Sequence, residues 1–121
     1  MFMPRLVAVA LALCCAACAS QEPPPPSATG TSDMTAQAAE RGRLLADRTC
    51  AGCHATGPAG VSPMAEATPF REVVRQYPLD ELEAAFAQGL VTSHPAMPAF
   101  AFRASEIDDL IAWLETVKSE P

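Results

Sequence analysis

Hydrophobic and polar positions form four helical patterns after residue 34, and the chain shows no alternation typical of a β-strand. The clearest helix is predicted over residues 106–118, with Ser105 as its cap and Asp108 in a capping-box position. Its apolar positions recur on one face: Ile107, Leu110, Ile111, Leu114 and Val117. Acidic residues in its first turn and Lys118 in its last suit the helix dipole. We therefore expect an all-α fold in which this helix covers the core.

A first helix is predicted over residues 35–48, with its cap among Ser32, Asp33 and Thr35. Gly42 lies in its middle, where glycine costs about 1 kcal/mol relative to alanine. Such a glycine indicates a position where another backbone or ring must come close.

Two shorter helices are predicted between these. Residues 69–76 begin with a proline, which favours the first helical position, and Thr68 precedes it as a possible N-cap. Residues 79–88 stop at Gly89, a common end of a helix. The positions expected to be buried on this helix are Leu82, Ala85 and Phe86.

Residues 1–20 have the pattern of a secretory signal: a short basic start, an apolar run over residues 6–13, and small residues after it. The apolar run is too short to span a bilayer. Residues 21–34 are predicted to be a linker, because four consecutive prolines favour an extended, semi-rigid spacer. The folded domain is therefore expected over residues 35–119.

Two cleavage sites compete in this signal. Ala16, Ala17 and Cys18 resemble the end of a bacterial lipobox, in which Cys18 is lipidated, although Cys15 stands where that motif prefers leucine. Alternatively, an Ala-x-Ala site places cleavage before Ser20. We favour the first alternative, a lipoprotein anchored through Cys18, because a tether-like linker follows the signal directly. Both alternatives predict export to the bacterial periplasm, with or without a membrane anchor.

Composition sets further limits on the 121-residue chain. The formal charge is −6 and there is no basic run, so nucleic acid is not an expected partner. The predicted domain is small and contains few aromatic residues, so its side-chain core is thin. A large apolar cofactor would fill such a core.

One motif in the domain predicts that cofactor. Cys50, Cys53 and His54 form the sequence Cys-x-x-Cys-His, the c-type haem attachment motif. Two thiols three positions apart on a turn can reach the two vinyl groups of a porphyrin, and the next residue then directs its imidazole at the iron. Ala51 and Gly52 are small enough to let the backbone lie close to the ring. We therefore expect one covalently bound haem c per chain, with His54 on the iron.

Other uses of the cysteine pair fit less well. A thioredoxin-like dithiol requires a preceding strand, whereas a helix is predicted before Cys50. A zinc site requires two further ligands, and His94 is the only histidine left. A disulfide between Cys50 and Cys53 would be strained and would not cross-link distant parts of the chain.

The iron is expected to take a second ligand from a short list. Met97 is favoured because prolines on both sides hold its loop rigid. Met64 lies only ten residues after His54, which leaves little chain to reach the opposite face of a porphyrin. His94 competes and would give a bis-histidine iron of lower potential, whereas Met34 lies at the edge of the linker.

A ligating imidazole normally donates its other nitrogen proton to a carbonyl, which fixes the ring. We assign this carbonyl to Pro63, in the loop after the motif, with Pro58 as the alternative.

With the haem motif and Met97 in place, the domain resembles the class I c-type cytochromes of bacteria over about residues 36–118. Gly42 matches the glycine at which the first helix of this family crosses the last, and Trp113 matches the aromatic residue that packs on it. Ala46 departs from the family, which often has an aromatic residue there. The resemblance implies a small cytochrome c fold, with about four short helices around one haem.

The resemblance also implies a function. A family member would be a one-electron carrier rather than an enzyme, exchanging electrons with membrane or periplasmic redox proteins as a monomer or as a subunit of a redox complex. Tyr77, Arg71 and Arg75 are candidates to meet the haem propionates, with a solvated helix face as the alternative for both arginines. The competing function is a haem-based sensor or a peroxidase-like enzyme with a labile sixth ligand.

Overall fold

The computed structural model describes residues 28–90 and 96–120, and within these two stretches the regular structure is entirely helical. The helices are α1 (Ala28–Thr49), α2 (Phe70–Gln76), α3 (Leu79–Ala87) and α4 (Ala104–Ser119). The predicted all-α class is confirmed. None of these helices is both long enough and apolar enough to cross a membrane. The predicted signal with Cys18, the linker up to residue 27, and His94 lie outside the described residues.

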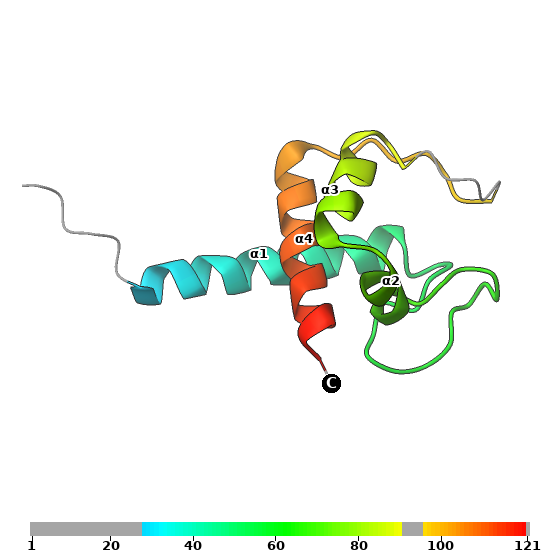
Figure 1. The fold of residues 1–121 in the computed structure, drawn as a ribbon, viewed down its shortest axis with the longest axis horizontal. Helices are drawn as coiled ribbons and strands as arrows, with labels where there is room; N and C mark the ends of the chain where they lie inside the picture. Colours follow the sequence, from blue (N-terminus) through cyan, green and yellow to red (C-terminus); the bar gives the residue numbers. More distant parts are fainter. Residues whose placement is uncertain (1–27, 91–95, 121) are drawn as a thin grey trace, which may run out of the picture.

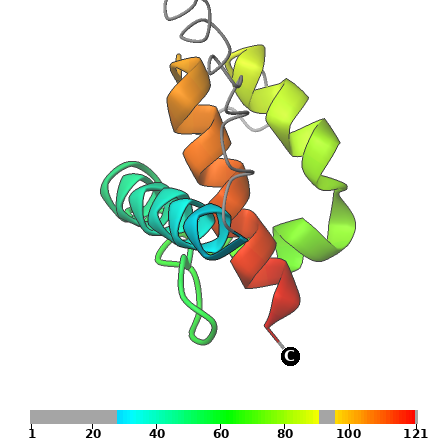
Figure 2. The same cartoon turned by 90° about the vertical axis from the view of Figure 1, so that its left-hand side faces the viewer.

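Helix α4 is the element on which the other three assemble. Helix α1 crosses it, and α2 and α3 also pack against it (Figure 1). The view along α1 shows α4 and α3 as separate rods, with α2 below α3 (Figure 2). The core therefore forms around α4, as the long apolar stripe of that helix predicts.

The crossing of α1 and α4 depends on Gly42. A β-carbon on Gly42 would overlap the carbonyl oxygen of Asp109 and would lie 2.9 Å from the β-carbon of Trp113. Ala46, one turn further along α1, is fully buried at the same crossing. Arg41 closes the edge with two hydrogen bonds to the Asp109 carboxylate, 2.8 Å from Nε and 2.7 Å from Nη2. The prediction that Gly42 allows another backbone to come close is confirmed, because α4 passes against it at Asp109.

The core includes most of the apolar residues predicted to be buried. On α4 the buried side chains are Ile107, Leu110, Trp113, Leu114 and Val117. Ile111, which we predicted on the same face, is half-buried. On α3 only Phe86 is buried, because Leu82 and Ala85 face a cavity.

Helix α1 begins at Ala28, seven residues before its predicted start, so residues 28–34 are helical although we assigned them to the linker. Residues 30–37 are exposed, and this part of α1 projects from the domain (Figure 1). Thr35 is not a cap, because its hydroxyl donates to the Thr31 carbonyl inside the helix at 3.1 Å. The run of prolines ends at residue 26, and no residue of 28–34 prevents a helix.

Two other predicted caps are wrong. The N-cap of α2 is Pro69 rather than Thr68, and it makes no side-chain cap bond. The N-cap of α4 is Arg103 rather than Ser105. The Arg103 N–H donates to the Glu106 carboxylate at 2.9 Å, and the two side chains form an ion pair at 2.8 Å. The Glu106 carboxylate therefore accepts the backbone N–H of the N-cap residue, and the Ser105 hydroxyl does not cap the helix.

Candidate functional site

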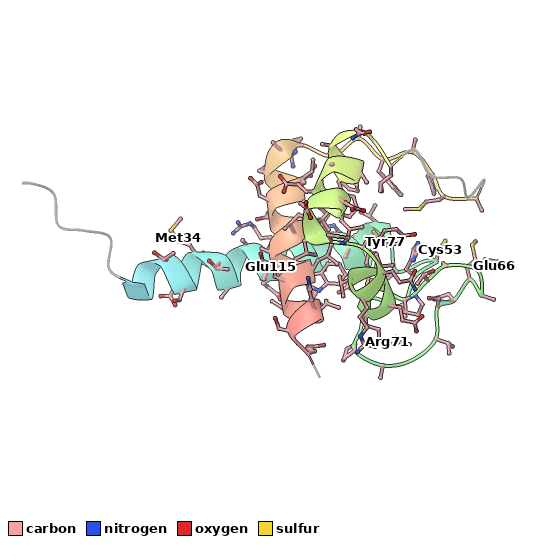
Figure 3. The ribbon with its side chains drawn as sticks, viewed as in Figure 1. Met34, Cys53, Glu66, Arg71, Tyr77 and Glu115 are labelled. Atoms are coloured by element: carbon pink, nitrogen blue, oxygen red, sulfur yellow. The ribbon has the colours of Figure 1, made fainter. Side chains whose placement is uncertain are left out.

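A cavity of about 700 Å³ opens between α2, α3, the end of α1 and the segment after residue 95. Large apolar side chains form most of its wall: Phe70, Val73, Leu82, Phe86, Leu90 and Phe100. Of the residues that line it, only Glu66 and Glu81 are charged, and both are exposed. Figure 3 shows Cys53, Glu66 and Tyr77 on one side of the domain, away from the projecting end of α1. An apolar interior with charge only at the rim suits a large apolar ligand.

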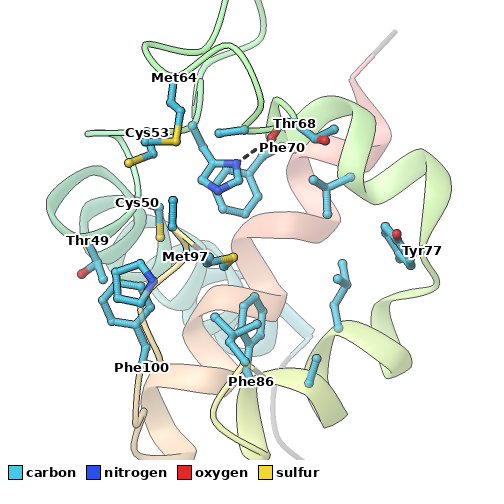
Figure 4. A pocket seen from close by; sticks show the side chains of 18 of the residues that line it. Thr49, Cys50, Cys53, Met64, Thr68, Phe70, Tyr77, Phe86, Met97 and Phe100 are labelled. Atoms are coloured by element: carbon cyan, nitrogen blue, oxygen red, sulfur yellow. Dashed lines mark hydrogen bonds between the residues drawn. The ribbon is translucent and has the colours of Figure 1, made fainter. Parts of the chain in front are cut away.

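The predicted attachment motif lies at the end of α1 and faces this cavity. The Cys50 N–H donates to the Ala46 carbonyl at 2.7 Å, and the Cys53 and His54 N–H groups both donate to the Cys50 carbonyl, at 3.0 and 2.9 Å. These bonds continue a helical turn past the end of α1. Residues three and four positions apart share a face of such a turn, so the two thiols and the imidazole all line the cavity (Figure 4).

Cys50 and Cys53 do not form a disulfide with each other. Burial, with smaller contributions from the charges of Asp47 and Cys53, raises the pKa of the Cys50 thiol to about 11. Redox-active dithiols depend on a lowered pKa, so this environment is the opposite of the one they need. Within residues 28–90 and 96–120, no three His, Cys, Asp or Glu side chains are grouped to hold a metal ion. Both findings argue against the dithiol and zinc alternatives.

His54 is oriented by a carbonyl that the sequence did not identify. Its Nδ1 lies 2.7 Å from the carbonyl oxygen of Thr68 (Figure 4). A carbonyl can only accept, so Nδ1 carries the proton and Nε2 has the free lone pair. The assignment to Pro63 is wrong: Pro63 is exposed and does not line the cavity, and neither does Pro58. Thr68 precedes the N-cap of α2, so its carbonyl lies outside the helix and is available to the imidazole.

Three hydrogen bonds fold the loop after the motif back over His54. The Met64 N–H donates to the Cys53 carbonyl at 3.1 Å, and the Phe70 N–H donates to the Ala55 carbonyl at 3.0 Å. The Ala55 N–H donates to the Ser62 hydroxyl at 3.1 Å. Together they bring the chain before α2 next to the imidazole.

Two thioethers line the cavity. Met64 lies beside Cys53, whereas Met97 lies lower, toward Phe86, on a separate part of the chain (Figure 4). The backbone bond to Cys53 holds Met64 on the motif side. Met34 is 72 % exposed on the projecting part of α1, so it is no candidate ligand in this arrangement.

Of the three residues proposed to meet propionates, only Tyr77 lines the cavity, and it is half exposed. Arg71 is used elsewhere: its Nη2 donates to the Gly60 carbonyl at 2.9 Å and lies 3.6 Å from Glu72. Arg75 is exposed and does not line the cavity. The solvated-face alternative therefore describes Arg75, and Arg71 braces the loop after the motif.

Sequence comparisons find known proteins that are similar to this chain. Residues 37–114 match the family model described as cytochrome c oxidase, cbb3-type, subunit III. Cytochrome c-552 of Bradyrhizobium diazoefficiens is 30% identical to this chain over 91 residues, which cover 75% of this chain and 86% of that protein. No solved structure matches the chain.

Proposed function

The chain belongs to the c-type cytochromes, which are haem-based electron carriers, and we propose on this premise that it is an exported one-electron carrier with a single covalently attached haem c. Cys50 and Cys53 hold the haem, and His54 and Met97 bind its iron. The observation that carries this proposal is the convergence of two thiols, one imidazole and two thioethers on a single apolar cavity.

The residues of the cavity fit a haem. When bound, the haem supplies the one-electron chemistry, and the protein supplies binding, orientation and a dry surrounding. The Thr68 carbonyl keeps Nδ1 of His54 protonated, which fixes the ring and makes Nε2 a stronger ligand. Binding of the iron by the Met97 thioether together with the His54 imidazole would raise the reduction potential relative to two imidazoles. Phe86 and Phe100 line the cavity and exclude water from it.

The place of action follows from the N-terminal sequence. The signal pattern of residues 1–20 supports export, and lipidation of Cys18 would anchor the chain to a membrane. The projecting part of α1 would then lengthen the spacer between the lipid and the haem. The partners of this protein are redox proteins of the same compartment. It exchanges electrons with them as a free carrier or as a subunit of a complex. Mass spectrometry of the mature chain distinguishes a lipidated Cys18 from cleavage before Ser20.

The iron ligand is tested with two matched substitutions. Met97→Ala should keep the covalent haem but lose the weak red absorption band of a methionine–iron bond, and its potential should fall. Met64→Ala removes the other thioether of the cavity and should leave the band in place. A band that survives Met97→Ala would contradict the ligand assignment. A high-spin spectrum in the unsubstituted protein would favour the sensor or peroxidase-like alternative.

A further inference from the structure

Three aromatic rings form a continuous series that leads away from the haem cavity. The His54 and Phe70 rings have centroids 5.2 Å apart and are tilted by 43°. The Phe70 and Trp113 rings are 5.1 Å apart in an edge-to-face contact. Phe70 is 8% exposed and Trp113 is 4% exposed, so the series runs through a dry, packed interior.

The series ends at a second hollow. This hollow has a volume of about 290 Å³ and is lined by Trp113 and by residues of α1, the loop after the motif and the end of α4, of which Gly57, Pro58 and Val117 are not polar. It shares no lining residue with the haem cavity. Phe70 lines the haem cavity but not the hollow, and Trp113 lines the hollow but not the cavity. The contact between their rings therefore connects the haem cavity to the hollow.

The rim of the hollow is held by hydrogen bonds. Asp47 accepts from the Thr56 hydroxyl at 2.8 Å and from Arg43 Nη1 at 2.6 Å. These bonds tie the start of the loop after the motif to α1, beside the indole of Trp113. The hollow is therefore a built feature of the fold, with an aromatic wall and a polar rim.

We propose that Phe70 and Trp113 form a second electron path, which couples the His54 imidazole to this hollow. The inference rests on the proposed function, because His54 must be bound to the haem iron. Electronic coupling decays less steeply through packed atoms than across a water-filled gap, and each step of this path is a direct ring contact. A redox partner seated at the hollow would take one electron from the iron, or return one, without touching the cavity mouth. No bond forms and no proton moves in this exchange.

The path is tested with a photosensitiser at two positions. Glu120 lines the hollow and Glu81 lines the haem cavity, and both are exposed. A thiol-reactive ruthenium tris-bipyridine complex is attached to Glu120→Cys or to Glu81→Cys in the haem-loaded protein. A flash then starts electron transfer between the label and the haem, and the rate constant is measured by haem absorbance. Each measurement is repeated in a Phe70→Leu background, which keeps an apolar side chain but removes the ring.

The comparison of the two labels separates the path from a general effect on the haem. We expect Phe70→Leu to slow transfer from the Glu120 label several-fold more than transfer from the Glu81 label, which shares only the effect of Phe70 on the haem cavity. Equal slowing from both labels, or no slowing from either, would overturn the path. Reduction potentials and thermal unfolding midpoints of the same samples show that driving force and fold are preserved. Trp113→Leu, which also removes a ring, provides a second variant with the same expectation, in case Phe70→Leu does not fold.

Failure of the path and failure of the proposed function give different results. If the path is absent but the chain is an electron carrier, both labels still exchange electrons with the haem and respond alike to Phe70→Leu. If the proposed function is wrong because no haem is bound, neither label gives a haem absorbance change even with Phe70 and Trp113 intact; if the chain is instead a sensor or a peroxidase-like enzyme, both labels react but the haem is high-spin.

Discussion

Replacement of Gly42 by alanine tests the helix crossing that positions the site. The added β-carbon would lie 2.5 Å from the Asp109 carbonyl carbon and 2.9 Å from the β-carbon of Trp113, and it would overlap the Asp109 oxygen. The obstacle on one side is the backbone of α4, which no side-chain rotation can relieve. Helices α1 and α4 must therefore move apart, and contacts around the buried Leu114 must loosen.

The expected cost follows from two opposing effects. Overpacking a core costs typically 1–3 kcal/mol, and a clash with backbone belongs at about the upper end of that range. Alanine returns about 1 kcal/mol through its better helix propensity. Gly42→Ala should therefore lower the free energy of unfolding by about 2 kcal/mol. For a domain of this size that corresponds to a fall in Tm of about 8–16 °C.

The assay is thermal unfolding of the haem-loaded protein followed by circular dichroism, with Gly30→Ala as the control. Gly30 lies in the same helix, but a β-carbon there would meet nothing within 4 Å. The control should unfold at the temperature of the unsubstituted protein or slightly above it. A Gly42→Ala variant as stable as the control would refute the close crossing, because helix propensity alone would then decide the outcome.

Two further substitutions test local interactions. The side-chain hydrogen bond from Arg103 holds the pKa of the Glu106 carboxyl below its usual value, so Arg103→Ala should raise that pKa in an NMR pH titration. The pKa of Glu106 is lower in the folded chain than in the unfolded chain. The pair therefore stabilises the fold above the ordinary carboxyl pKa, and this contribution is lost as the pH falls through the pKa of the folded chain. An unchanged Glu106 titration in Arg103→Ala would count against the pair. Ser62→Ala removes the acceptor of the part-buried Ala55 N–H, which should cost about 1–3 kcal/mol and speed amide hydrogen exchange at Ala55. Exchange as slow as in the unsubstituted protein would mean that this bond does not hold the loop.

Sequence patterns predicted the features that depend on local chemistry. Helical periodicity identified the helices, because each buries one face against the core. The spacing of Cys50, Cys53 and His54 predicted their common face, because three- and four-residue separations align on a turn. Gly42 was predicted to mark a close approach, because glycine in a helix has a cost that only such packing offsets.

The sequence did not predict features that depend on how the loop folds. The partner of His54 is the Thr68 carbonyl, and every residue has a carbonyl, so no residue type marks it. Its position before a proline that opens a helix was a usable hint, because such a carbonyl lies outside the helix. No such hint in the sequence marked Ser62 as the acceptor of the Ala55 N–H. The helical start of α1 was missed because residues 30–34 are exposed, so no apolar pattern marks that part of the helix.

The central claim is that one haem is covalently held through Cys50 and Cys53. The most direct measurement is the intact mass of the protein made in bacteria that have haem ligation machinery, compared with a Cys50→Ala, Cys53→Ala variant made alongside. The account predicts a coloured chain heavier by one haem, whose colour survives extraction with acid and organic solvent, and a variant without that mass. A colourless chain in which both thiols are alkylated would contradict the account.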